Sequence, residues 1–406
     1  MLEDRSSFVS KNTLAAYGIE ELESKQEKQP SENNHRQELT VAPQPANSTK
    51  SGNKSSKNDG SDTTMLIDAV GRDISINCLI RCPRATYGLI ATLNRSFRDF
   101  IKSQEIYKLR HDNEVIEYWV YFSCHFAKWE AFDPSTRKWM QLPILDADHC
   151  FQVSDRESMG VGTELLVLGK NLTGPAIYKY SFLQNSWSLG QTMNTPRCLF
   201  GSASLGQTAI FAGGVNQTGK IMDTVELYDS RSGIWETLPS MIKPRKMCSG
   251  VYIDGKFYAI GGIGQRLTSL TCGEEYDFET KKWTEIPNMM PIDARGGRTA
   301  PPLLAVVSNE LYAADSAKME LKKYDKRKKE WEVIGRLPER AHSVDGWGMA
   351  FRGCGERVIV IGGPRRDDRK VVEIYSWAPR NGPPEWSLIG QKRSDNFVYN
   401  CAVMGC

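Results

Sequence analysis

The sequence predicts a mainly β protein: a six-bladed β-propeller closed by its own C-terminal strand and preceded by a small α-helical segment. Three observations predict this fold: tryptophans that recur at a constant interval, apolar stretches that end in a glycine pair, and a last apolar stretch with no neighbour to pair with. Similarity at a fixed period of roughly 20 to 50 residues is the signature of repeat proteins. Most of the chain is therefore expected to consist of copies of one unit.

The tryptophans set the length of this unit. Five of them, each 48 residues from the next, are Trp139, Trp187, Trp235, Trp283 and Trp331, and Trp386 follows after 55 residues. An aromatic residue stands seven positions before each of the first five, at Phe132, Tyr180, Tyr228, Tyr276 and Tyr324. Turn residues lie between the two aromatics, as in YDSRSGIW, so we expect two strands joined by a tight turn. The sixth unit has a longer turn, because Trp386 follows Tyr375 by 11 positions.

The glycine pairs mark the end of a buried strand in each unit. They close the stretches AIFAGG at Gly213 and Gly214, FYAIGG at Gly261 and Gly262, and VIVIGG at Gly362 and Gly363. Glycine permits a positive φ or a close approach of two backbones. The second unit has only Gly169, and the fifth has Ala314 and Asp315 instead, so we expect altered turns there. A dinucleotide-binding loop is not favoured at GGIG, because the third glycine and the following helix are both missing.

Four short strands with a glycine pair and spaced Tyr and Trp residues resemble one blade of a kelch-type β-propeller. The aromatic residues are expected to fill the wedge between neighbouring blades, and not to do chemistry. The first unit supplies only three strands, in EYWVYFS, KWEAFDP and KWMQLP. We therefore expect FVYNCAVMGC, residues 397–406, to complete blade one and to remove both exposed edges of the ring.

Two further segments precede the propeller, which we place at residues 113–406. Residues 1–62 are rich in Ser, Asn, Lys, Gln and Pro, so they are expected to form a disordered tail. Residues 63–112 carry apolar side chains at helical spacing, with Pro83 separating the two stretches: Ile76, Leu79 and Ile80, then Leu89, Ile90, Leu93, Phe97, Phe100 and Ile101. A unit this small is expected to dock on something, either the chain's own propeller or a partner.

The helical segment resembles an F-box. The positions that match are Leu66, Ile67, Ile74, Leu79, Ile80, Pro83, Leu89, Leu93 and Phe97. Two departures stand out: Ile67 replaces the proline that usually follows the first leucine, and the region of Phe97 and Phe100 replaces the terminal tryptophan. In that family these residues bind the adaptor Skp1, which connects the protein to a cullin-RING ubiquitin ligase.

The resemblance extends over residues 64–406 to the plant F-box/kelch-repeat proteins. It is carried by NRSFRDFIKS, PRCLFGSASLG, RKMCSGVYIDGKFYAIGGI, CGEEYD and FVYNCAVMGC. It implies a non-catalytic substrate receptor of an SCF (Skp1-cullin-F-box) ubiquitin ligase, whose propeller holds a target protein. A kelch scaffold that acts without the ligase is the alternative, although such a scaffold has no use for the helical segment.

The composition argues against several other classes of protein. A net charge of +3 on 406 residues gives no reason to expect nucleic-acid binding. The ten cysteines include no CxxC pair, so neither a zinc module nor a disulfide framework is expected. No apolar run has the length of a signal peptide or a membrane span, which favours a soluble protein of the nucleus or cytoplasm without membrane contact.

A metal-dependent propeller enzyme remains an unfavoured alternative. The five histidines do not recur in phase, and the neighbours His149 and Cys150 are expected to lie in an ordinary loop. No GxSxG motif is present, and GSASLG at residues 201–206 falls in an expected inner strand. We therefore expect no catalytic residue, metal or cofactor.

The target surface is expected where the loops before the innermost strands meet the loops after the glycine pairs. Basic residues occupy the first set at Arg197, Arg245, Lys246, Arg295, Arg298 and Arg340, and the second set at Arg266, Arg365 and Arg366. Guanidinium groups form paired hydrogen bonds with carboxylates and phosphates, so an acidic or phosphorylated target segment is favoured. The alternative is that these loops are charged simply because they are exposed, since Asp293, Asp367 and Asp368 lie among them.

Overall fold

The computed structural model describes residues 66–67, 70–103, 105–125, 127–154, 156–291, 300–339, 346–363, 370–380, 382–394 and 396–405. The expected N-terminal tail, residues 1–62, lies outside these ranges. The chain divides into one unit at Met1–Met65 and a second at Leu66–Cys406, and the second contains all the helices and strands described below.

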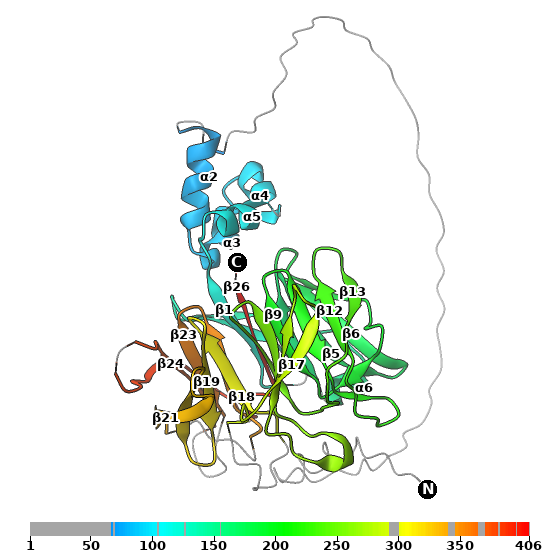
Figure 1. The fold of residues 1–406 in the computed structure, drawn as a ribbon. Coiled ribbons are helices and arrows are strands. Elements are labelled where there is room, and N and C mark those ends of the chain that lie inside the picture. The colour runs from blue at the N-terminus through cyan, green and yellow to red at the C-terminus, as the bar shows by residue number, and fades with distance from the viewer. Residues whose placement is uncertain are drawn as a thin grey trace, which may run out of the picture. The chain divides into compact units, whose positions relative to one another are not determined.

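Four short α-helices open the second unit: α2 (Gly71–Arg81), α3 (Tyr87–Ile90), α4 (Arg95–Lys102) and α5 (Glu105–Asp112) (Figure 1). Asn94 begins α4, because its side-chain oxygen accepts a hydrogen bond of 2.8 Å from the Phe97 amide. The apolar residues of the helices form one small core, which contains Leu66, Leu79, Ile80, Tyr87, Phe97, Phe100, Ile101 and Ile106. Five of the nine predicted apolar positions thus lie in this core, and Ile76 and Ile90 pack against it.

Six four-stranded antiparallel sheets follow, one for each predicted blade. In order from the innermost strand outward, the first three blades contain β26 (Asn400–Gly405), β1 (Tyr118–Ser123), β2 (Glu130–Asp133) and β3 (Lys138–Gln141); β4 (Glu157–Val161), β5 (Glu164–Asn171), β6 (Gly174–Ser181) and β7 (Ser186–Leu189); β9 (Gly201–Leu205), β10 (Thr208–Ala212), β12 (Val225–Asp229) and β13 (Ile234–Leu238). The six-bladed propeller predicted from the tryptophan interval is confirmed.

The last three blades have the same order of strands. They contain β14 (Ser249–Ile253), β15 (Lys256–Ile260), β16 (Gly273–Asp277) and β17 (Lys282–Ile286); β18 (Leu303–Val307), β19 (Glu310–Asp315), β20 (Glu320–Asp325) and β21 (Glu330–Arg336); β22 (Ala350–Cys354), β23 (Arg357–Gly362), β24 (Val371–Trp377) and β25 (Ser387–Arg393). A short helix, α6 (His149–Val153), and a two-stranded ribbon of β8 (Arg197–Cys198) and β11 (Val215–Asn216) lie in the connecting loops.

The C-terminal strand closes the ring as predicted. Strand β26 pairs antiparallel with β1 from Tyr118 opposite Gly405 to Ser123 opposite Asn400 (Figure 1). The Tyr399 amide extends this pairing with a hydrogen bond of 2.9 Å to the Ser123 carbonyl. The first blade therefore contains strands from both ends of the propeller, and β1 has no open edge.

The tryptophans join neighbouring blades. Each of the first five lies directly opposite the aromatic residue seven positions earlier, as Trp235 does opposite Tyr228 with ring centroids 5.0 Å apart. In blades two to six the indole Nε1 also donates to a carbonyl at or just beyond the end of the outer strand of the preceding blade. The five bonds run from Trp187 to Pro143 (2.8 Å), Trp235 to Gln191 (2.9 Å), Trp283 to Pro239 (2.7 Å), Trp331 to Met289 (3.1 Å) and Trp386 to Arg336 (2.9 Å).

The glycine pairs of blades three and four serve both predicted purposes. Gly214 has a φ of 96°, and a Cβ there would lie 2.5 Å from the Cys198 carbonyl oxygen. Gly262 has a φ of 94°, and a Cβ there would lie 2.5 Å from the Lys246 carbonyl oxygen. Both positions therefore exclude a side chain. In blade six, by contrast, Gly363 has no positive φ, and only the close approach of Phe397 accounts for it.

The two blades without a glycine pair have altered turns, as predicted. In blade two, β5 continues to Asn171 and pairs directly with β6, so that Asn171 lies opposite Gly174. The Asn171 side-chain oxygen accepts hydrogen bonds from the amides of Thr173 and Gly174, which closes this turn. In blade five, Asp315 lies opposite Glu320 across a similarly short turn.

Candidate functional site

The nine F-box-like positions separate into two groups. Leu66, Leu79, Ile80 and Phe97 lie in the core of the helical segment. Four others are exposed aliphatic side chains, with exposed fractions of 39% at Ile67, 58% at Ile74, 72% at Leu89 and 67% at Leu93. Pro83 is exposed as well, in the bend that follows α2. The first group therefore builds the helices, and the second group is available to a partner.

One further exposed aliphatic residue belongs with the second group. Val70, immediately before α2, is 42% exposed, and the helical periodicity did not identify it because it precedes the helix. We call Ile67, Val70, Ile74, Leu89 and Leu93 the exposed aliphatic set. Binding to a partner would remove these five apolar side chains from water.

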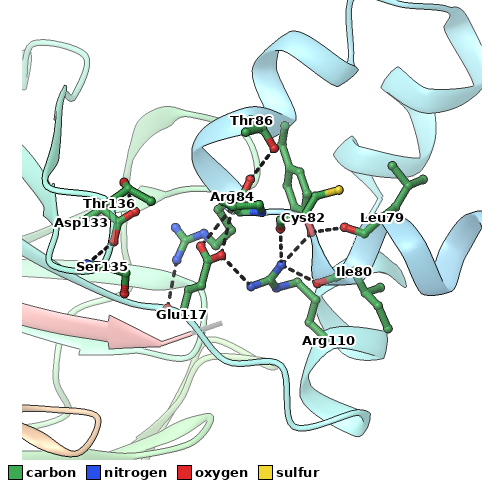
Figure 2. A network of polar contacts seen from close by, with 12 residues as sticks. Leu79, Ile80, Cys82, Arg84, Thr86, Arg110, Glu117, Asp133, Ser135 and Thr136 are labelled. Atoms are coloured by element: carbon green, nitrogen blue, oxygen red, sulfur yellow. Dashed lines mark hydrogen bonds and ion pairs between the residues drawn. The ribbon is translucent and has the colours of Figure 1, made fainter.

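A buried arginine holds the end of α2 in place. The Arg110 side chain is fully buried, and its Nη1 donates to the carbonyls of Ile80 (2.7 Å) and Cys82 (3.0 Å) and to the hydroxyl of Tyr87 (2.8 Å) (Figure 2). The Tyr87 hydroxyl in turn donates to the Leu79 carbonyl at 3.0 Å. A cation is favoured at this end of a helix, where carbonyls lack helical partners. Burial raises the pKa of Tyr87, although Arg110 counteracts this, so the phenol stays protonated as a donor.

Two of the predicted target-binding arginines are buried, and the expectation that they are exposed is wrong. Arg197 forms an ion pair with Glu226, and Arg245 forms one with Glu274, with no exposed surface on any of the four side chains. Burial lowers the pKa of Arg197, while Glu226 counteracts this.

The physical reason for this burial lies in the carboxylates. Glu226 accepts hydrogen bonds from the amides of Asn194 (2.8 Å) and Thr195 (3.0 Å), and Glu274 accepts them from Ile242 (2.6 Å) and Lys243 (3.0 Å). Each pair thus fixes the loop that enters its blade. The 48-residue spacing of the arginines reflects this structural role, and the equal spacing of the two glutamates was the signal that could have revealed it.

Blade five reverses the charges of this arrangement. Lys322 stands 48 residues after Glu274, and its Nζ donates to the Pro291 carbonyl at 3.0 Å and to Asp315 at 3.1 Å. By strand register, Asp315 takes the place that Gly261, the first glycine of the pair, has in blade four. Asp315, which departs from the repeat, is therefore the ion-pair partner of the buried Lys322.

The other predicted basic residues are only partly described. Lys246 is half-buried, and Arg266 is exposed at the tip of its loop with a φ of 57°. Arg295, Arg298, Arg340, Arg365 and Arg366 lie outside the described residues.

The predicted convergence of the two sets of loops occurs in blades three and four. Lys246 and Ile263 exchange main-chain hydrogen bonds of 3.0 and 2.7 Å, which join the entry loop of blade four to the loop after its glycine pair. The Met247 amide donates to the Leu199 carbonyl at 2.8 Å, which joins this assembly to blade three. We call residues 197–199, 213–222, 242–247 and 262–270 the blade 3–4 loop surface. It also carries Ile242 and Leu267, 55% and 67% exposed, which the charge pattern did not indicate.

The candidates for a metal site, His149 and Cys150, are not part of a cluster of possible ligands in the described ranges. Among the residues that the structure describes, no three His, Cys, Asp or Glu side chains are grouped so that they could hold a metal ion. His149 and Cys150 begin the helix α6, so the expectation that they lie in a loop is wrong: Asp148 starts the helix by accepting a hydrogen bond from the Phe151 amide, and both residues are exposed. Within the same described ranges, no helix has both the length and the apolar character needed to cross a membrane.

Known proteins resemble this chain over most of its length. F-box/kelch-repeat protein SKIP11 of Arabidopsis thaliana is 59% identical over 358 residues, which cover 86% of this chain and 77% of that protein. A second F-box/kelch-repeat protein of the same plant is 53% identical over 356 residues, or 85% of each chain.

Two further comparisons concern the propeller. Residues 196–242 and 244–290 match the Kelch motif family. The solved structure of YjhT has a TM-score of 0.50 at 13% identity, and it covers 64% of this chain and 91% of its own, which shows a similar fold only. The agreement with the plant relatives covers the helical segment as well as the propeller. This chain therefore belongs to the F-box/kelch-repeat proteins.

Proposed function

We propose that this chain is the substrate-recognition subunit of an SCF-type ubiquitin ligase. The exposed aliphatic set would bind a Skp1-like adaptor, and through it the cullin and RING subunits, while the propeller binds the protein to be ubiquitinated. In this role the chain is a non-catalytic adaptor of the nucleus or cytoplasm. The observation that supports the proposal is the exposed aliphatic set itself, which lies on α2 and α3 and in the turns beside them, while other apolar residues of the helical segment already fill a core.

The energetics of burial favour a partner at this surface. Burying a leucine or isoleucine side chain that is otherwise exposed contributes about 1.5 to 3 kcal/mol. Few interface residues carry most of the binding energy, so the two most exposed members, Leu89 and Leu93, are the strongest candidates. Neither belongs to the helical core, and their loss should leave the fold intact.

The target side of the proposal rests on the blade 3–4 loop surface. It presents the exposed cation Arg266 beside the exposed aliphatic residue Leu267, with Lys246 in the adjoining loop. An acidic or phosphorylated segment with an apolar neighbour has the complementary chemistry. The buried arginines shape this surface but do not contact the target.

The adaptor proposal is tested by replacing Leu89→Ala and Leu93→Ala together. Binding to a purified Skp1-like adaptor, measured by calorimetry, is expected to weaken by at least about 30-fold, which corresponds to about 2 kcal/mol. The matched control is Leu189→Ala, because this leucine on β7 is 66% exposed but lies in the propeller. Undiminished binding by a folded double variant would contradict the proposal, and wild-type protein that binds no adaptor would favour the scaffold alternative.

A further inference from the structure

The helices are joined to the propeller by a short connection. Helix α5 ends at Asp112 and β1 begins at Tyr118, so five residues link the two. A connection this short limits the separation of its ends but does not by itself fix their orientation. The contacts around it decide whether the helices can swing.

Arg84 makes several contacts across this junction, and Figure 2 shows it beside Glu117 of the connection. The residue lies in the 3-10 turn between α2 and α3, and its Nη2 donates to the hydroxyl of Tyr121 on β1 at 3.1 Å. Its guanidinium also lies over two aromatic rings of the propeller, 5.0 Å from the centroid of Trp119 and 4.6 Å from that of Phe182. A guanidinium favours such stacking, and a lysine cannot reproduce its planar geometry.

Phe182 gives the helices a second point of attachment. It lies just after β6, in the turn that precedes β7, and its ring meets that of Tyr107 on α5 edge to face at 4.7 Å. The neighbour of Arg84, Ala85, packs against the core between the first two blades. The helices are thus attached to two different blades, which opposes rotation about the connection.

Glu117 ties the polar groups of the junction together. Its carboxylate accepts a hydrogen bond of 3.0 Å from the Arg84 amide and lies 3.4 Å from Nη2 of the buried Arg110. Arg110 in turn holds the end of α2, which carries Ile74 of the exposed aliphatic set. A continuous series of contacts therefore connects blade one to the helix that presents the adaptor-binding residues.

From these contacts we propose that Arg84 and Phe182 are positioning residues that hold the adaptor-binding helices in one orientation on the propeller. This inference rests on the proposed function, in which the helices bind the ligase and the propeller binds the target. A fixed orientation of the helices keeps the bound target at a constant position relative to the ligase. The strands alternate in direction, so the blade 3–4 loop surface lies on the face of the propeller opposite to the start of β1. A rigid junction keeps these two sites at a constant separation. Free rotation of the helices about the connection would lower the effective concentration of the bound target at the ligase.

The test measures the distance between the helices and the blade 3–4 loop surface in the full chain. Spin labels are placed on the exposed thiols Cys78 of α2 and Cys198 of β8, with the cysteines at 82, 124, 150 and 406 replaced by serine. Double electron–electron resonance is expected to give one narrow distance distribution for the wild-type junction. Arg84→Ala combined with Phe182→Ala should at least double its width.

Matched controls separate positioning from stability. Arg81→Ala removes an exposed arginine whose side-chain bonds stay within α2, and Phe278→Ala removes the phenylalanine at the same turn position two blades later. Both controls should keep the narrow distribution. Hydrogen exchange of α2 and α5 should be unchanged in the double variant, which shows that the helices remain folded.

The outcomes distinguish this inference from the proposed function. An equally narrow distribution in the double variant, or an equally broad one in the wild type, would overturn the positioning role. Adaptor affinity should stay within about twofold, because the exposed aliphatic set is untouched. A wild-type chain that binds no adaptor but retains the narrow distribution would overturn the ligase function alone.

Discussion

At the scale of single residues, a guanidinium and a carboxylate determine the course of two loops. In blade four, Arg245 Nη1 donates to the Gly261 carbonyl at 2.8 Å while its ion pair with Glu274 is fully buried. The same carboxylate holds the amides of the incoming loop. A buried pair of this kind contributes little net stability when complete, but the loss of one partner leaves an uncompensated charge.

Arg245→Ala is therefore expected to lower the free energy of unfolding by about 3 to 5 kcal/mol, because Glu274 stays buried without its cation. Arg266→Ala is the matched control, since this arginine is exposed and its removal should change stability by less than about 0.5 kcal/mol. Urea denaturation followed by tryptophan fluorescence measures both. Equal stability of the two variants would show that the buried pair has no structural role.

Buried thiols predict a loss of stability at alkaline pH. Burial raises the pKa of Cys248 and of Cys401 from 9.0 to about 11. Both thiols then stay neutral in the folded chain while they ionise in the unfolded chain above pH 9, which favours unfolding. Their contribution to stability is complete below pH 9 and is lost as the pH rises to 11.

The free energy of unfolding, measured by urea titration at several pH values, should fall over this range. The fall should be smaller in a variant that carries Cys248→Ala and Cys401→Ala, because neither alanine titrates. Cys78→Ala serves as the control, since this thiol is exposed on α2. Identical slopes in all three proteins would contradict the role of the buried thiols.

At the scale of the elements, the interface between blades six and one differs from the other five. Trp139 donates no indole hydrogen bond to any residue that the structure describes, whereas each tryptophan of blades two to six does. Lys392 of β25 instead lies over its ring at 5.8 Å and forms an ion pair with Glu130 of β2. The chain itself also joins these two blades, because β26 follows β25 of blade six in sequence and pairs with β1 of blade one.

Deletion of residues 397–406 should consequently abolish cooperative folding of the ring. It removes the strand that pairs along all of β1 and exposes the inner edge of β1, which favours aggregation. Deletion of residues 1–60 removes none of the described elements and serves as the control. Size-exclusion chromatography and thermal unfolding measure the result, and a soluble C-terminal deletion with an unchanged melting temperature would show that closure does not depend on β26.

At the scale of the whole molecule, the fold could be predicted because each blade repeats the same solution. Trp187 and Trp235 each occupy the same position in the strand register of their blade, and each donates one indole hydrogen bond to the preceding blade. The constant interval between such tryptophans is therefore enough to predict the repeated blade. The site could be predicted only in part. The burial of Arg197 depends on Glu226, 29 residues away, and the exposure of Leu93 but not Leu79 depends on how four short helices pack. Such packing leaves no local signal in the sequence.

Closure by β26 also has a consequence for synthesis on the ribosome. Strand β1 leaves the ribosome early, but the innermost strand of its blade spans Asn400–Gly405 and is made almost 300 residues later. At a synthesis rate of about 5 to 20 residues per second, the first blade lacks its innermost strand for on the order of tens of seconds. During that interval the nascent chain exposes an open strand to chaperones and proteases. A chain truncated before β26 never leaves this state, so ring closure also serves as a check that translation has passed β26.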